Sequence, residues 1–152
     1  MTGELKLGGK YQVQDNASGT ITRCEPPREL ALTWEFGGGV SWVEVRLSAE
    51  GDATRLELRH IAHPEDHWEK FGPGAVGVGW ELGLMGLSHH IADPSAAKPP
   101  ESDPAWFVSD DAKRFIRLSC EGWRDTAIAG GADAVWAAES AERTRKFYSG
   151  ES

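Results

Sequence analysis

The chain has 152 residues, 39% of them hydrophobic, and a formal net charge of −8 at pH 7. This is enough for one domain with its own core, while the negative charge would repel phosphate backbones and anionic lipids, so neither nucleic acid nor a membrane is an expected partner. Two cysteines are too few for a disulfide framework, and the N-terminus carries no signal-like apolar run, so we expect a cytoplasmic protein.

The first part of the chain, from Leu5 to about His63, is predicted to form an antiparallel sheet. Short runs of alternating apolar and polar residues are separated there by turn residues. Pro26 and Pro27 end one of these strands, because proline has no N–H to donate to a neighbouring strand.

The hairpin that follows is the most informative segment, because apolar residues alternate in residues 30–36 and again in residues 43–47. A loop over residues 37–40 and a turn at residues 50–52 would place all of these apolar side chains on one face. The expected pairs are Phe36 with Ser41, Trp34 with Val43, Leu32 with Val45, Leu30 with Leu47, Leu47 with Leu56, Val45 with Leu58, and Val43 with His60.

Residues 76–91 are predicted to form a long helix that covers this face. Its apolar residues recur at helical spacing: Val76, Trp80, Leu84, Leu87 and Ile91. Four glycines lower its intrinsic helicity, so tertiary packing must hold it.

The remaining chain is predicted to contain a linker at residues 93–108 and a helical extension at residues 109–152 that packs on the domain. One helix follows an N-cap at Ser109 or Asp110, and a second runs from about Asp133 to Tyr148. The stripe of the first helix consists of Ala112, Phe115, Ile116, Ser119 and Trp123.

Motifs for metal, dinucleotide or acid–base chemistry are weak in this chain. His60, His63 and His67 have a spacing that could suggest metal ligands. Pro64 prevents them from sharing one helical face, and no further pattern supports zinc. Residues 72–77 match G-x-G-x-x-G, but no apolar strand leads into them. We therefore expect no cofactor and no metal.

Catalysis has only two candidate groups near the predicted apolar face. These are His60 and Glu81, and the position of Glu81 on the helix puts it at the rim rather than inside. We therefore assign no catalytic residue, and the sequence favours a binding protein over an enzyme.

Four segments in order resemble one known family: CEPPRELALTWEF (24–36), SWVEVRL (41–47), TRLELRHIAHPEDHW (54–68) and GPGAVGVGWELGLMGL (72–87). They resemble the SRPBCC, or START-like, superfamily, in its branch homologous to activators of the heat-shock chaperone ATPase. The resemblance implies an α+β helix-grip fold over residues 1–92, in which an antiparallel sheet packs on one long helix. It also implies that the family's first strand and two short helices are missing, because Met1 falls where the second strand is about to begin.

The resemblance further implies a cavity between the sheet and the long helix. The positions that match it are Trp34, Phe36, Val43, Val45, Leu58, His60, Trp80 and Leu84. The same side chains would also serve as an ordinary hydrophobic core, and that alternative stays open.

The leading functional hypothesis is binding of a hydrophobic or aromatic small molecule in this cavity. The alternatives are a protein-interaction role like that of chaperone ATPase activators, and a polyketide cyclase or dehydratase-like enzyme. A chaperone and a second copy of the chain are therefore the other partners considered.

Overall fold

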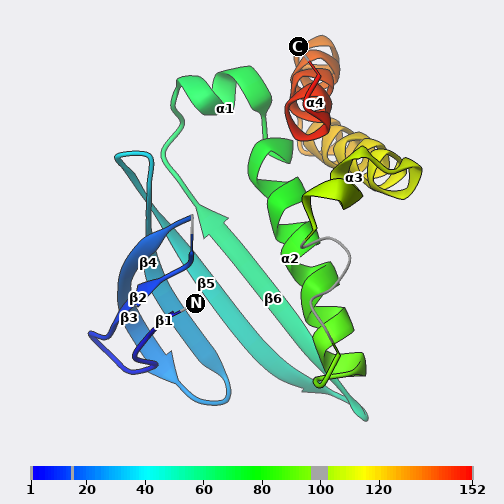
Figure 1. The fold of residues 1–152 in the computed structure, drawn as a ribbon. Coiled ribbons are helices and arrows are strands. Elements are labelled where there is room, and N and C mark those ends of the chain that lie inside the picture. Colours follow the sequence, from blue (N-terminus) through cyan, green and yellow to red (C-terminus); the bar gives the residue numbers. More distant parts are fainter. Residues whose placement is uncertain (1, 15, 97–102, 152) are drawn as a thin grey trace. The chain divides into compact units, whose positions relative to one another are not determined.

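The chain forms two compact units, Met1–His63 and Pro64–Ser152. The computed structural model describes residues 2–14, 16–96 and 103–151. The first unit contains the strands and the second the helices (Figure 1). None of the described helices is both long enough and apolar enough to cross a membrane.

The first unit is a six-stranded antiparallel sheet whose strands lie side by side in chain order (Figure 1). The described part of residues 2–61 contains strands and turns and no helix. The strands are β1 (Thr2–Gly3), β2 (Lys10–Gln12), β3 (Ser18–Glu25), β4 (Glu29–Phe36), β5 (Gly39–Glu50) and β6 (Ala53–Ile61). As expected from the sequence, β3 ends directly before Pro26 and Pro27.

The predicted register of the β4–β5 hairpin is wrong by two residues. Phe36 faces Gly39 and Trp34 faces Ser41, so the loop contains only Gly37 and Gly38. Both glycines have positive φ, 60° and 86°, which is the backbone that a two-residue type I′ hairpin turn requires. The observed pairs further along are Leu32 with Val43 and Leu30 with Val45.

The two-residue error leaves the predicted faces intact, because strand side chains alternate with a period of two. The β5–β6 register is as predicted: Leu47 faces Leu56, Val45 faces Leu58 and Val43 faces His60. One face of the sheet therefore carries the apolar residues, and the other carries the charged ones together with Trp42.

The second unit consists of helices. They are α1 (Asp66–Phe71), α2 (Gly74–Ala92), the 3₁₀ helix η2 (Pro104–Val108), α3 (Asp110–Ala129) and α4 (Ala134–Ser149). The side chain of Ser109 accepts the N–H of Ala112 at the start of α3, and Asp133 accepts that of Trp136 at the start of α4, so both helices begin where their caps predict.

The segment expected to be a linker, residues 93–108, is partly helical. Residues 97–102 lie outside the described residues, and η2 occupies the end of the segment. Asp103 accepts the N–H of Ala105, and Pro104 is the first residue of η2, a position where proline's fixed φ and missing N–H cost nothing. The sequence analysis read this proline only as a sign of a linker.

The core of the helical unit lies between α2, α3 and α4. Its centre is formed by Val78, Ile116 and Cys120. Glycines allow this close packing, since a Cβ at Gly77 would overlap the indole ring of Trp123. The residues packed around this centre are Leu82, Phe107, Phe115, Trp123, Ala141 and Tyr148.

Helix α2 has two apolar sides. Successive helical residues are about 100° apart, so Val78 and Leu82, which pack in the core of the helical unit, share one side of the helix. The predicted stripe of Val76, Trp80, Leu84, Leu87 and Ile91 falls on the other side. Four of its five members, all but Trp80, keep more than a third of their surface exposed. The helix therefore presents a second apolar surface that the helical core does not use.

Helix α1, which the sequence analysis missed, is held by side chains of α4. Carbonyls near a helix C-terminus have no partner within the helix. Here the carbonyls of Glu69, Lys70 and Phe71 accept hydrogen bonds from α4. The donors are the Trp136 indole Nε1, the Arg143 Nε and the Thr144 Oγ1.

Candidate functional site

The apolar face of the sheet contains one polar pair, Ser41 and His60. The Oγ of Ser41 lies 2.8 Å from the Nε2 of His60, and it also lies 3.3 Å from the carbonyl oxygen of Trp34, to which it can donate. The indole ring of Trp34 meets the imidazole edge to face, with 6.0 Å between ring centroids. Three neighbouring strands thus bring an aromatic ring, a hydroxyl and an imidazole together.

The environment keeps this imidazole uncharged. Burial lowers the pKa of His60 below its usual value, because the charged form loses solvation. At neutral pH, His60 is therefore a neutral ring whose nitrogens act as one donor and one acceptor. With the Ser41 hydroxyl, it gives an otherwise apolar surface two groups that can orient a polar atom of a ligand.

Six of the eight residues proposed from the sequence lie on this one face of the sheet. Alternation and the observed register place Trp34, Phe36, Val43, Val45, Leu58 and His60 there. Val43 is 2% exposed, whereas Phe36, at the end of the hairpin, is 61% exposed. Val43 is thus a core position, and Phe36 lies at the margin of the face.

The other two proposed residues, Trp80 and Leu84, belong to the helical unit. Both lie on the apolar stripe of α2 that faces away from the helical core, and Leu84 is 41% exposed. Their assignment to a shared cavity with the sheet stays a prediction.

Ser41 is the residue that the sequence analysis missed. The predicted four-residue loop paired it with Phe36, at the hairpin end and away from Trp34. Two adjacent glycines between alternating strands indicate a two-residue type I′ turn. Had Gly37 and Gly38 been interpreted in that way, Ser41 would have been placed opposite Trp34.

Glu81 lies on α2 between the apolar stripe and the core-facing side of Val78 and Leu82. Its carboxylate accepts a hydrogen bond from the Ser119 hydroxyl of α3. Ser119 itself is buried. This bond gives Glu81 a structural partner within the helical unit, and His60 is then the one acid–base candidate left from the sequence analysis.

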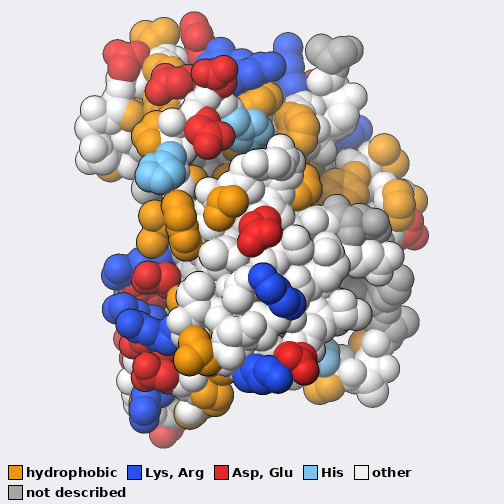
Figure 2. Space-filling model, turned by 90° about the vertical axis from the view of Figure 1, so that its left-hand side faces the viewer, with side chains coloured by type: hydrophobic (Ala, Val, Ile, Leu, Met, Phe, Trp, Pro, Cys, Tyr) orange, Lys and Arg blue, Asp and Glu red, His pale blue; other side chains and the backbone are white. Residues whose placement is uncertain are grey.

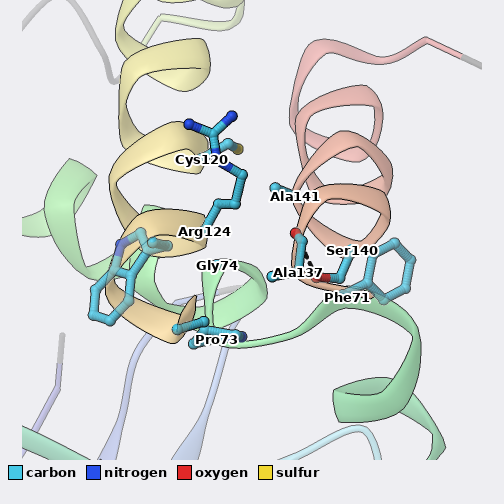
Figure 3. Close-up of a pocket in the computed structure, with 10 residues that line it drawn as sticks. Phe71, Pro73, Gly74, Cys120, Arg124, Ala137, Ser140 and Ala141 are labelled. Carbon is cyan, nitrogen blue, oxygen red and sulfur yellow. Dashed lines mark hydrogen bonds between the residues drawn. The ribbon is translucent and has the colours of Figure 1, made fainter. Parts of the chain in front are cut away.

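A small hollow lies inside the helical unit, between α3, α4 and the start of α2 (Figure 3). Its volume is about 10 Å³, which is room for one water molecule. Figure 3 shows Cys120 and Arg124 on one wall and Ser140 on the other, with the Ser140 hydroxyl donating to the carbonyl of Ala137. The hollow is far too small for an organic ligand.

A wider hollow lies on the charged side of the sheet, over β3, β4 and β5. Its volume is about 210 Å³, and its lining includes Arg23, Glu29, Glu44 and Arg46. Arg23 and Glu29 form an ion pair at 2.7 Å. Acidic and basic side chains also lie intermixed on the face shown in Figure 2, an arrangement that does not attract phosphate.

The structure supports neither of the cofactor motifs considered in the sequence. Within the described residues, no group of three or more His, Cys, Asp or Glu side chains is placed to hold a metal ion. The glycine motif at residues 72–77 joins α1 to α2 and follows a helix rather than a strand. Its glycines serve close packing instead, since a Cβ at Gly72 would lie 2.9 Å from the Ser140 hydroxyl oxygen.

Comparison with solved structures finds two structures of CalU16 among the matches. In its crystal structure, CalU16 from Micromonospora echinospora matches with a TM-score of 0.62 and 38% sequence identity over 82% of this chain. The solution NMR structure of CalU16 matches with a TM-score of 0.64 and 34% identity over 86% of this chain.

This chain spans 66% of the length of the crystallised CalU16 chain and 70% of the NMR chain. No curated protein matches. The fold is thus the α+β helix-grip fold of CalU16.

A family model described as "Activator of Hsp90 ATPase homolog 1-like protein" matches residues 1–92. The match covers the sheet and both α1 and α2. This chain therefore belongs to the Activator of Hsp90 ATPase homolog 1-like family, a branch of the SRPBCC, or START-like, superfamily.

Proposed function

We propose that the protein binds a hydrophobic or aromatic small molecule on the apolar face of its sheet. The observation that carries the proposal is the cluster of Trp34, Ser41 and His60. Small-molecule sites are mostly apolar and contain a few polar groups that fix the orientation of the ligand. The Ser41–His60 pair supplies such groups in an apolar setting.

The helical unit carries an apolar surface of its own, on α2. Its stripe contains Trp80 and Leu84 and is not used by the helical core. An unfilled apolar surface of this kind on a monomer commonly marks a binding site. In this arrangement apolar burial would supply most of the affinity, at about 25 cal/mol per Å².

The test is binding of 2-naphthol, an aromatic probe with one hydroxyl, measured by calorimetry. Replacing Trp34 by alanine removes an aromatic wall, and we expect affinity to fall about tenfold or more, because a tryptophan buries 150–250 Å². The matched control is Trp42→Ala, since Trp42 lies on the opposite face of the same sheet and contacts His63. That variant should bind as the wild type does.

Naphthalene, which lacks the hydroxyl, tests the polar pair. Ser41→Ala should weaken binding of 2-naphthol and leave naphthalene unchanged. The assignment of the site is wrong if Trp34→Ala remains folded by circular dichroism and binds 2-naphthol with unchanged affinity.

A second candidate function follows from the family description, which refers to activators of the Hsp90 ATPase. Such a role would use an outer surface of the protein and need no cavity. Purified Hsp90 and this chain distinguish the two, because stimulation of ATP hydrolysis that persists in Trp34→Ala would favour the interaction role.

A cyclase or dehydratase-like activity is the third candidate, and His60 is the residue that it would use. The lowered pKa of His60 suits a general base at neutral pH. Turnover of an aromatic polyketide substrate that is lost in His60→Ala, at unchanged stability, would support this reading. Turnover that survives the substitution would remove His60 from that role.

A further inference from the structure

Strand β6 forms one edge of the sheet and is long enough to pair with another strand. Its nine residues pair with β5 on one side, and in the described sheet β6 has no second strand neighbour. Most of its residues are exposed, among them Leu56 at 37% and Ile61 at 46%. An edge with unpaired N–H and C=O groups is a template for a strand from another chain.

On the charged side of the sheet, opposite charges face each other on the two strands nearest this edge. In one row Glu29 lies between Arg23 and Arg46, at 2.7 and 3.8 Å. Arg46 in turn faces Glu57 on β6. In the neighbouring row Glu44 faces Arg59. At the edge the two rows meet, because Arg59 Nε and Glu57 Oε1 on β6 form an ion pair at 2.6 Å, and both side chains are partly exposed.

A second copy of β6 can continue these rows if it pairs antiparallel about a two-fold axis at Leu58. That axis places Glu57 opposite Arg59 of the second copy, and Arg59 opposite Glu57 of the second copy. Both rows then keep alternating across the junction, and opposite charges on facing strands are stabilising. On the apolar side, Leu58 meets its own copy, and Leu56 meets His60 of the second copy.

Other registers that keep the apolar faces together suit the charges less well. An axis at Glu57 would place two carboxylates face to face, and one at Arg59 would place two guanidinium groups together. An axis at Leu56 would pair Arg55 with Glu57 but leave Arg59 opposite an alanine, Ala53. Like charges directly opposite one another are destabilising, so the axis at Leu58 fits best.

We propose that β6 is a self-association edge, through which two copies of this chain join their sheets in an antiparallel pair centred on Leu58. The interface is isologous, because each copy contributes the same strand. It leaves the apolar sheet face of each copy continuous with that of the other.

Charge reversal of the full chain, followed by sedimentation equilibrium, tests this proposal. We expect a concentration-dependent dimer of the wild type. Glu57→Arg and Arg59→Glu should each weaken the dimer about tenfold or more, because each turns two attractive pairs into repulsive ones. An equimolar mixture of these two variants should dimerise again, since opposite charges then face each other in both pairs.

The matched control is Arg55→Glu, the same change of charge on the same strand. Under the proposed axis Arg55 faces Ile61 of the second copy, so the dimer should be retained. Circular dichroism of each variant verifies that the sheet is intact. A wild type that stays monomeric, a dimer unaffected by Glu57→Arg and Arg59→Glu, or a dimer broken by Arg55→Glu alone would each overturn the proposal.

Discussion

The two faces of α2 can be distinguished by the same substitution at two of its glycines. Glycine to alanine inside a helix gains up to about 1 kcal/mol in helix propensity. At Gly83 the new Cβ meets no heavy atom within 4 Å, so this gain should be realised. At Gly77 the Cβ would overlap the Trp123 ring, and overpacking of a core costs about 1–3 kcal/mol.

Because the whole indole ring would have to move, we take the upper end of that cost. Gly77→Ala should then lose about 2 kcal/mol and Gly83→Ala should gain about 1 kcal/mol. The two variants would differ by about 3 kcal/mol in the free energy of unfolding. For a chain of this length each kcal/mol shifts Tm by about 2–4 °C, so the two variants should differ by about 9 °C in Tm.

Thermal and urea unfolding followed by circular dichroism measure this difference. If Gly77→Ala is as stable as the wild type, α2 does not pack on α3 through its glycine side. The apolar stripe would then no longer be identified as the side of α2 that the helical core leaves exposed.

Three further predictions follow from individual contacts. Because the pKa of His60 is lowered in the folded chain, protonation of this ring favours the unfolded chain. The free energy of unfolding should be highest above pH 6.5 and fall as the pH drops through the lowered pKa, and NMR titration with urea unfolding at each pH checks this. Burial raises the pKa of Cys120 to about 11, so stability should decline as the pH rises above 9, and iodoacetamide should reach this thiol only on unfolding. Thr144→Val leaves the carbonyl of Phe71 without its 2.8 Å hydrogen bond and should cost about 1–3 kcal/mol in urea unfolding.

The strands and their faces could be predicted from the sequence because side-chain alternation is a local signal. Residues 30–36, 43–47 and 56–60 each carry it, and a shift by two residues does not disturb it. The β4–β5 register depended on the turn, and there the backbone preference of Gly37 and Gly38 mattered more than the apolar pattern. The β5–β6 register was correct because its turn was placed correctly at Gly51.

The two sides of α2 were harder to predict, because a helix with apolar residues all round has no single periodic stripe. The sequence analysis found the stripe through Trp80 and Leu84. It missed the side of Val78 and Leu82 that packs in the helical core, because glycines such as Gly77 allow close contacts that hydropathy does not reveal. The hydrogen bond between Glu81 and Ser119, 38 positions apart in the chain, has no local signal at all.

The hydrogen bonds between α1 and α4 constrain the amino acids of the two helices differently. The acceptors at positions 69, 70 and 71 are main-chain oxygens, which every amino acid possesses. The donors are particular side chains at positions 136, 143 and 144. Saturation mutagenesis should therefore find positions 69 and 70 permissive and positions 136, 143 and 144 restrictive, although each contact involves one residue from either side.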